Sequence, residues 1–365
     1  MDIAQVLKNA SELGISEVFI APGFELSFKN AGELLPQGGS KLSAMDTEEI
    51  ARHVYMLAGD RSFDKFNACG DDDFSFSLPG IGRFRVSVFR QRGSISMVIR
   101  VARLTLPDFE HLNIPKSVID LYLLNKGLVL ITGPAGSGKS TTLSFIVDKI
   151  NRTMPYHIIT IEDPIEYLYS NDKSIVTQRE VNQDTTDIAT AVKYAAGQSP
   201  NVLLISSLND YKTISSAMEA AEAGQLVLST MHTIGAANTI DRIIDEFPPA
   251  RQQKIRVQLS MTLQAVVSQQ LIPALNGGMV PAFEIMISNG MVRSLIREGK
   301  VDQINNVIYS NPEMNMITMD SSIYRLYSKG MISADNAVDY STDAEVMRKR
   351  VKIEQAPPEP PGDAK

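Results

Sequence analysis

The chain has 365 residues, 44% of them hydrophobic, and a formal net charge of −7. This length and hydrophobic content can fill the cores of two ordinary domains. The acidic balance argues against a protein whose main work is broad nucleic-acid binding. The one cysteine, Cys69, excludes an intramolecular disulfide framework and a four-cysteine zinc ribbon, and we expect its side chain to be half-buried.

The N-terminal part of the chain, residues 1–105, predicts a small α/β domain. Helical spacing of apolar residues covers Ile3–Leu13, a strand candidate follows at Glu17–Ile20, and a second helix is expected at Thr47–Leu57. Met1 is followed by this amphipathic stretch rather than by a basic head and an apolar run, so we expect no secretory signal. No stretch approaches the roughly 18 apolar residues that suggest a membrane span.

An alternating run from Arg83 to Arg90 predicts a strand that follows a proline-glycine turn. Successive side chains of a strand point to opposite faces. Phe84, Val86 and Val88 should therefore lie on one face, and Arg83 and Arg85 on the other. A second strand, Ser96–Arg103, is expected to pair with the first across Gly93. The two strands together predict an antiparallel hairpin.

The pattern of the sequence changes after this domain. Residues 106–115 hold two prolines and little periodicity, which is typical of an interdomain linker. Residues 116–354 then alternate strand and helix patterns and predict a parallel sheet covered by helices on both faces, with a mostly helical part from Ala250 onward. Residues 355–365 hold four prolines, and we expect them to be disordered. The strand candidates are Leu128–Thr132, Ile158–Ile161, Val202–Ile205 and Leu226–Thr230.

A phosphate-binding motif follows the first of these strands. The segment Gly133–Ser140 reads Gly-Pro-Ala-Gly-Ser-Gly-Lys-Ser and fits the Walker A pattern in full. The glycines let backbone N–H groups point into one hollow, Lys139 would reach the β- and γ-phosphates, and the Ser140 hydroxyl would ligate Mg²⁺. The helix Thr141–Ile150 adds its positive N-terminal end. The predicted ATP-binding residues are Gly133, Pro134, Ala135, Gly136, Ser137, Gly138, Lys139, Ser140 and Thr141.

A P-loop ATPase also needs an acid near its magnesium ion and a base that orients the attacking water. Glu162 is the first candidate, because it ends a strand and begins a segment with three acids within five residues. The strand Val202–Ile205 instead ends in Ser206 and Ser207, with no carboxylate until Asp210. The absence of an acid directly after that strand is unexpected for an ATPase.

His232 is a further polar candidate near the C-terminal end of a strand, where ligands bind in parallel sheets. A lone histidine is commonly structural. Its position after Leu226–Thr230 equally suits a group that senses the γ-phosphate. Both interpretations of His232 therefore stay open.

With these motifs, the chain resembles the type IV pilus retraction ATPases, the PilT/PilU group of the type II/IV secretion ATPases, over nearly all of its length. The resemblance rests on the Walker A segment, an acidic box, a histidine box and a C-terminal helix, at Gly133–Ser140, Ile161–Tyr167, Ser229–Thr233 and Val292–Lys300. It implies the α/β fold class, with a PAS-like N-terminal domain, a RecA-like C-terminal ATPase domain, and a hexameric ring that binds ATP and Mg²⁺.

The resemblance also implies partners and a location. Such proteins drive pilus retraction and twitching motility from the cytoplasm, peripherally at the inner face of the cell membrane and next to an inner-membrane platform protein. The ring would be a homo-oligomer or would mix with a paralogue, without nucleic acid and without direct membrane insertion. Arg83, Arg85 and Arg90 match arginines that approach the phosphates, although a solvated strand face would also explain them.

The chain departs from the family in one catalytic strand. Where the family has Gly-Glu-Met-Arg-Asp, residues 206–210 read Ser-Ser-Leu-Asn-Asp, so Ser207 replaces the Walker B glutamate. A serine is no base near neutral pH without an activating partner. Glu162 would compensate, since the resemblance places its strand beside the P-loop strand. Slow hydrolysis and a non-catalytic, ATP-binding partner of an active paralogue therefore both stay open.

Two other classes of protein fit the sequence less well. Pilus assembly and secretion ATPases share the core but usually carry longer N-terminal regions and a four-cysteine zinc element, which Cys69 alone cannot form. A DNA translocase could also use a RecA-like core. The net negative charge of this chain, however, does not predict the positively charged groove with which such a protein binds the phosphates of DNA.

Overall fold

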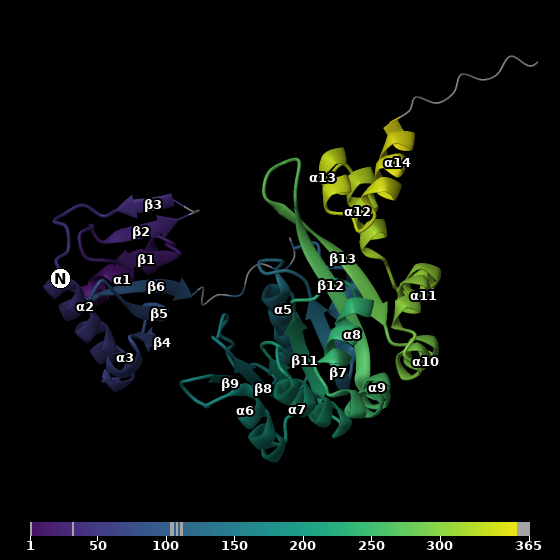
Figure 1. Ribbon diagram of the computed structural model, residues 1–365, viewed down its shortest axis with the longest axis horizontal. Helices are drawn as coiled ribbons and strands as arrows, with labels where there is room; N and C mark the ends of the chain where they lie inside the picture. The colour runs from purple at the N-terminus through teal and green to yellow at the C-terminus, as the bar shows by residue number, and fades with distance from the viewer. Residues whose placement is uncertain (1, 31–32, 103–105, 107–108, 110–111, 356–365) are drawn as a thin grey trace, which may run out of the picture. The chain divides into compact units, whose positions relative to one another are not determined.

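The computed structural model describes residues 2–30, 33–102, 106, 109 and 112–355. The chain divides into two compact units, which are described one at a time (Figure 1). The N-terminal unit comprises Met1–Leu106 together with two later segments, Asp163–Leu168 and Arg179–Thr186, and the C-terminal unit comprises the other residues. Residues 107–108 and 110–111 of the predicted linker and nearly all of the predicted disordered tail lie outside the described residues.

The N-terminal unit is built on a six-stranded antiparallel sheet with the strand order β3-β2-β1-β6-β5-β4. Its core unites apolar side chains of the sheet and of the helices, which confirms an α/β domain. The predicted second helix begins before Thr47, because Ser43 and Asp46 form a capping box. The helices are α1 (Ile3–Glu12), α2 (Ala44–Leu57) and α3 (Asp64–Cys69). The strands are β1 (Glu17–Ile20), β2 (Ser27–Asn30), β3 (Glu33–Pro36), β4 (Asp71–Leu78), β5 (Gly82–Gln91) and β6 (Ser94–Ala102).

Strands β5 and β6 form the antiparallel hairpin that the sequence predicted. Its two-residue turn, Arg92 and Gly93, has positive φ at both positions, the geometry that matches the twist of the strands it joins. Burial alternates along β5, with Phe84 fully buried and its neighbours Arg83 and Arg85 half-buried, as expected. The alternation of β5 therefore sets these two arginines on the face away from the core.

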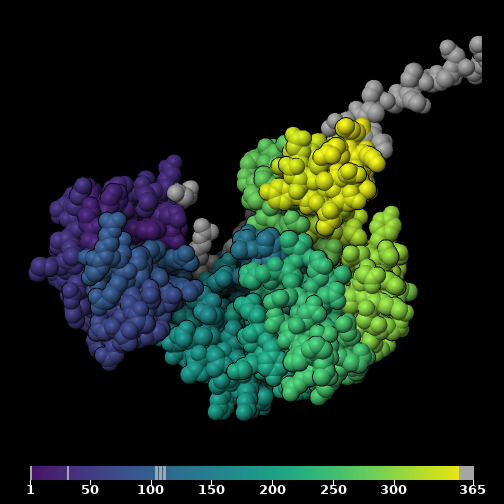
Figure 2. All heavy atoms as spheres, viewed as in Figure 1, coloured from purple at the N-terminus to yellow at the C-terminus, as the bar shows by residue number. Residues whose placement is uncertain are grey.

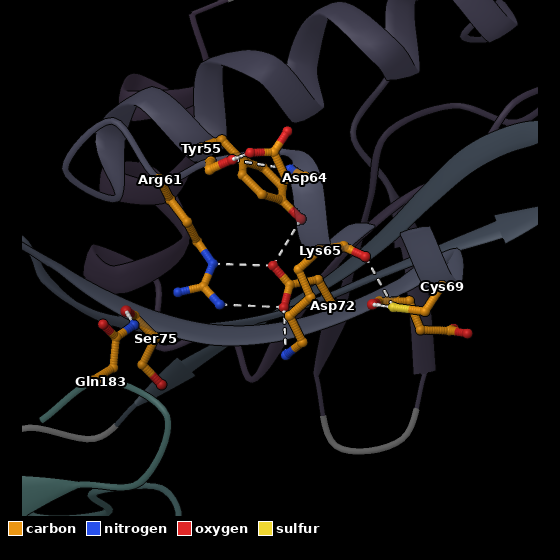
Figure 3. Close-up of polar contacts among 10 residues, drawn as sticks. Tyr55, Arg61, Asp64, Lys65, Cys69, Asp72, Ser75 and Gln183 are labelled. Atoms are coloured by element: carbon orange, nitrogen blue, oxygen red, sulfur yellow. Dashed lines mark hydrogen bonds and ion pairs between the residues drawn. The ribbon is translucent and has the colours of Figure 1, made fainter. Parts of the chain in front are cut away.

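A buried carboxylate ties the helices of this unit to its edge strand β4 (Figure 3). Asp72 accepts hydrogen bonds from Tyr55 Oη and Arg61 Nε, both at 3.0 Å, and pairs with Lys65 Nζ at 2.9 Å. Burial raises the pKa of Asp72, but the hydrogen bonds and charges of Arg61 and Lys65 outweigh it and lower the pKa below its ordinary value. Cys69, at the end of α3, is exposed, so the predicted half-buried thiol was wrong.

The C-terminal unit contains a seven-stranded sheet with the order β13-β12-β7-β11-β10-β8-β9. The strands β12, β7, β11, β10 and β8 pair in parallel, as predicted for this domain. All of β7 is buried, so both faces of the sheet are covered. The strands are β7 (Gly127–Thr132), β8 (His157–Glu162), β9 (Ile175–Glu180), β10 (Val202–Ile205), β11 (Leu226–Met231), β12 (Leu263–Pro273) and β13 (Met279–Ile287).

The helices of this unit follow the strands and then dominate the C-terminal end. Those among and just after the parallel strands are α4 (Lys116–Ile119), α5 (Lys139–Thr153), α6 (Ile188–Ala195), α7 (Tyr211–Glu222), α8 (Ala236–Asp245) and α9 (Pro249–Thr262). Those after the last strand are α10 (Gly290–Glu298), α11 (Ile304–Ser310), α12 (Met319–Ser328), α13 (Ala334–Asp339) and α14 (Ala344–Gln355). Within the described ranges, no helix combines the length and the apolar content needed to cross a bilayer.

The prediction of a mostly helical region from Ala250 onward was wrong for one stretch. Helix α9 ends at Thr262, and the chain then forms the long antiparallel hairpin of β12 and β13. Strand β12 pairs with β7 inside the sheet and is buried on both faces, so its apolar residues do not alternate with polar ones. Such a run cannot be told from a buried helix by periodicity.

The far end of this hairpin packs against the last helices. Ile272, Val280 and Ala282 of the hairpin share a core with side chains of α12, α13 and α14. The ribbon shows the hairpin reaching toward these helices (Figure 1). Their atoms, yellow in the space-filling view, gather at one end of the unit (Figure 2). The hairpin thus links the central sheet to the C-terminal helices.

Candidate nucleotide-binding site

The P-loop follows β7 and ends where α5 begins, as the motif requires. Gly133, Gly136 and Gly138 all have positive φ, a region that favours glycine. A Cβ on Gly133 would lie 2.1 Å from the carbonyl oxygen of Gln269, and one on Gly138 would lie 2.8 Å from its Nε2. Strand β12 therefore backs the loop so closely that only glycine fits at position 133. At position 138 the positive φ favours glycine, and the end of the Gln269 side chain would have to move to admit a Cβ.

The polar groups of the loop suit a phosphate chain. Lys139 is buried and its Nζ donates to the carbonyl oxygens of Gly133 and Pro134, at 2.9 and 2.8 Å. Among the described side chains, the buried hydroxyls of Thr132 and Ser137 have no hydrogen-bond partner. Buried polar groups without partners are rare and costly, so these hydroxyls fit a site that a polar ligand completes.

Magnesium would depend on the nucleotide for most of its ligands. In the described part of the chain, no group of three or more histidine, cysteine, aspartate or glutamate side chains is placed to hold a metal ion. Ser140, in the first turn of α5, is the residue that the motif assigns to Mg²⁺. The magnesium ion prefers a few protein oxygens together with phosphate oxygens and water, so this arrangement fits it.

Glu162 ends β8 and lies buried in a network of side chains. Its Oε1 accepts hydrogen bonds from Thr160 Oγ1 at 2.6 Å and from Gln178 Nε2 at 3.2 Å. Strand β8 does not lie beside the P-loop strand, contrary to expectation, because β10 and β11 separate it from β7. With about 4.8 Å between neighbouring strands, the two strands lie roughly 14 Å apart. Glu162 is therefore farther from the P-loop strand than Ser207 is.

Strand β10 ends at the position where the sequence motif predicts a catalytic acid. Ser207 is half-buried and accepts a hydrogen bond from Asn209 Nδ2 at 2.8 Å. The neighbouring Ser206 Oγ is buried without a partner among the described atoms. Two short, neutral side chains thus stand at the end of the strand, and neither is a base at neutral pH.

The next carboxylate along the chain, Asp210, is used by the fold. It caps α7 by accepting hydrogen bonds from the backbone N–H groups of Lys212 and Thr213, at 2.8 and 3.0 Å. Burial raises the pKa of Asp210, but these hydrogen bonds outweigh it and lower the pKa. Because the carboxylate of Asp210 already accepts hydrogen bonds from these two N–H groups of α7, we do not assign it the role of the acid that is missing at Ser207.

His232 follows β11, the strand next to the P-loop strand. Burial and the positive charge of Lys139 both lower the pKa of His232, so its imidazole is neutral at pH 7. His232 and the P-loop thus follow neighbouring parallel strands, β11 and β7. A neutral imidazole there can donate one hydrogen bond and accept another.

The three predicted arginines belong to β5 in the N-terminal unit, and the structure does not group all of them. Arg83 Nη2 pairs with Glu180 at 2.6 Å, and Arg85 lies with Arg83 on a pocket of about 330 Å³ inside that unit. Arg90 occupies the opposite face of the strand, where its guanidinium lies 5.0 Å from the ring centre of Phe66. The period-two pattern could have separated Arg90 from the other two arginines.

The hairpin of β12 and β13 supplies contacts to the site that the sequence analysis missed. Gln269 is buried and its Oε1 accepts a hydrogen bond from Thr142 Oγ1 of α5 at 2.7 Å. Its neighbour Ser268 accepts a hydrogen bond from Gly235 N, in the loop after His232, at 3.0 Å. The signal was a run of three polar residues, Ser268 to Gln270, inside the apolar run of β12.

Comparisons with known proteins place the chain in a family. Residues 2–313 match the family described as "Type II/IV secretion system protein". The chain is 37% identical to the type IV pilus retraction ATPase PilT of Pseudomonas aeruginosa, over 92% of this chain and 97% of that protein. It is 35% identical to the type IV pilus ATPase PilU of the same organism, over 97% and 92% of the two chains.

A solved structure of the pilus retraction motor PilT with bound ADP is also similar. It superposes with a TM-score of 0.88 at 39% sequence identity, covering 96% of this chain and 99% of that one. The similarity thus spans both units and the P-loop. The chain belongs to the type II/IV secretion system protein family, within its PilT/PilU group.

Proposed function

We propose that the chain is an ATP-binding motor of the type IV pilus machinery that drives or assists pilus retraction and hydrolyses ATP slowly. The observation that carries the proposal is the P-loop, where only glycine fits at position 133 against Gln269. Lys139 is buried there, and the hydroxyls of Thr132 and Ser137 have no partner among the described atoms. The similar PilT structure, with its bound ADP, supports nucleotide binding here. The names of the relatives support the role in retraction.

The roles of the residues follow from their chemistry. The P-loop N–H groups and Lys139 would bind the phosphates, and Ser140 would hold Mg²⁺, which neutralises phosphate charge when bound. The neutral imidazole of His232 would hydrogen-bond to the γ-phosphate. Glu162 is the candidate base, although its strand is three places from the P-loop strand in the sheet, and Arg83 and Arg85 are candidates to stabilise charge on the transferring phosphoryl group. Slow hydrolysis follows, since Ser207 cannot orient water as a glutamate does.

A turnover assay with purified protein, ATP and Mg²⁺ tests this proposal. We expect weak turnover in the parent, none in Lys139→Ala, and an increase of about 10²-fold or more in Ser207→Glu, the scale of a positioned general base. Ser207→Gln is the matched control, because it adds the length of glutamate without its basicity. Turnover at background in the parent, rescued by Ser207→Glu, would contradict a motor that works alone.

The assembly and location are part of the same proposal. We expect a hexameric ring, uniform or mixed with a paralogue, in the cytoplasm at the inner face of the membrane and in contact with a platform protein. The 97% coverage of PilT supports an assembly of the same kind. Light scattering of the purified chain with and without an ATP analogue measures the oligomer, and a monomer under all conditions would contradict the ring.

A further inference from the structure

A cavity of about 210 Å³ lies beside the P-loop, within the C-terminal unit. Gly138 of the loop and Thr141 of the first turn of α5 line one side of it. Leu271 of β12 and Met279 of β13 line it from the hairpin. A Cβ built on Gly138 would lie 4.0 Å from Leu271 Cδ1, which is an ordinary contact distance. The wall of the cavity therefore begins at the phosphate-binding loop itself.

The lining of this cavity suits a neutral part of a nucleotide. None of the described residues that line it is charged. The apolar side chains among them are Leu112, Ile114, Leu271, Met279 and Pro281. The volume is below the roughly 300–1,000 Å³ of pockets that hold whole drug-sized ligands. The phosphates would bind instead to the backbone N–H groups where α5 begins. The part of ATP that fits the apolar cavity next to that turn is therefore the base.

The side chain of Asn113, which also lines the cavity, can make hydrogen bonds that depend on the base. Thr142 and Gln269 line the cavity too, but they are hydrogen-bonded to each other at 2.7 Å. Asn113 is exposed, and within the described ranges no residue forms a hydrogen bond with its side-chain amide. Its φ of +52° lies in the left-handed region, which asparagine and glycine adopt more readily than other residues. The backbone thus presents an amide with both a donor and an acceptor to the cavity.

We propose that the base of the bound nucleotide occupies this cavity and that Asn113 selects adenine over guanine. This inference rests on the proposed binding of ATP. An asparagine amide donates to N7 of adenine and accepts from its N6 amino group, whereas guanine presents two acceptors, O6 and N7, at the same edge. Apolar walls discriminate only weakly between ligands of similar size, so they would bind either purine. The amide of Asn113 is then the group that determines which base is preferred.

Calorimetric titration of the full chain with Mg²⁺ tests the proposal with three ligands. These are non-hydrolysable analogues of ATP and of GTP, and inorganic tripolyphosphate, which has no base. We expect the parent to bind the ATP analogue about tenfold more tightly than the GTP analogue, the scale of one base-specific contact. Asn113→Gly keeps a residue that tolerates positive φ and removes the amide. In this variant, we expect weaker binding of the ATP analogue, equal affinities for the two analogues and an unchanged affinity for tripolyphosphate.

Asn315→Gly is the matched control, because Asn315 also has a positive φ, +60°, but does not line this cavity. It should keep the parent preference for adenine. Met279→Ser changes the apolar wall, so it should weaken the binding of both analogues by similar factors and leave tripolyphosphate binding unchanged. A preference for adenine that persists in Asn113→Gly overturns the inference, and so does a parent that binds both analogues equally. A parent that binds none of the three ligands would instead contradict the proposed nucleotide binding.

Discussion

Gly133 shows how strictly the backbone limits the residue at the start of the P-loop. Its φ is +141°, and a side chain there would collide with the carbonyl oxygen of Gln269. We expect Gly133→Ala to weaken ATP binding by about tenfold or more, because backbone strain of this kind costs about 1–3 kcal/mol. Titration with a fluorescent ATP analogue measures the change in Kd.

Gly136 provides the control for this substitution. Its φ is also positive, at +76°, but a Cβ there would meet no atom within 4 Å. Gly136→Ala should therefore cost less affinity than Gly133→Ala, since it adds strain without a collision. Equal losses in the two variants would show that the close approach of β12 has no bearing on binding.

Single residues were predictable from the sequence where a local motif defines them. Lys139 and Ser140 needed only the Walker A pattern, and Ser207 was identified as a departure because the rest of the family motif surrounds it. Glu162 was different, since its distance from the P-loop depends on the order of strands in the sheet. Strand order is a long-range property that local periodicity does not carry. The approach of Arg83 and Arg85 to the phosphates stays a prediction.

Strand β12 carries the closest contacts to the P-loop, so it is the element to test. Gln269→Leu removes the acceptor for Thr142 Oγ1 and leaves that buried hydroxyl without its partner. An unsatisfied buried hydroxyl costs about 1–3 kcal/mol, so we expect a loss of ATP affinity of about tenfold. Calorimetric titration with an ATP analogue measures it.

The neighbouring residue separates this effect from general damage to the strand. Gln270 is less buried, and its side chain points to the opposite face of the sheet. Gln270→Leu should keep the parent affinity. An affinity in Gln269→Leu that equals that of Gln270→Leu would contradict a role for the Thr142 contact.

At the scale of elements, the sequence was informative wherever periodicity was strong. The strand at Val202–Ile205 has its predicted bounds, and the other predicted parallel strands differ by one residue at either end. The hairpin of β12 and β13 was missed, because the apolar run after α9 neither alternates nor stands apart from the helix before it. Of the elements that form the site, the P-loop was therefore predicted from the sequence, and strand β12, which packs against it, was not.

The whole molecule contains separate hydrophobic cores in its two units, so each unit can be destabilised by itself. Asp72→Asn should lower the free energy of unfolding of the N-terminal unit by about 1–3 kcal/mol at pH 7, because it weakens the contacts with Arg61 and Lys65. Urea unfolding of the full chain, with hydrogen exchange followed in β4, measures the change. An equal loss of protection in β7 would contradict a local effect.

The pH dependence of this variant follows from the direction of the pKa shift. The pKa of Asp72 is lowered in the folded state, so its contribution to stability is complete above the ordinary value of 3.8. It is lost as the pH falls through the folded-state pKa, where the carboxylate takes up a proton. The stabilities of the parent and of Asp72→Asn should therefore converge at low pH. A difference that stays constant down to the lowest pH would argue against an ionic role for Asp72.

The exposed position of Cys69 at the end of α3 has a practical consequence. It is the one thiol in the sequence, so a maleimide dye would label each chain at a single, known place without any substitution. Its Sγ lies 3.0 Å from the carbonyl oxygens of Lys65 and Asp71, near the side chains that bind Asp72 (Figure 3). A ring of such chains would carry one dye per subunit. Stepwise photobleaching would then count the subunits, and energy transfer between mixed dyes would follow their motion during nucleotide turnover.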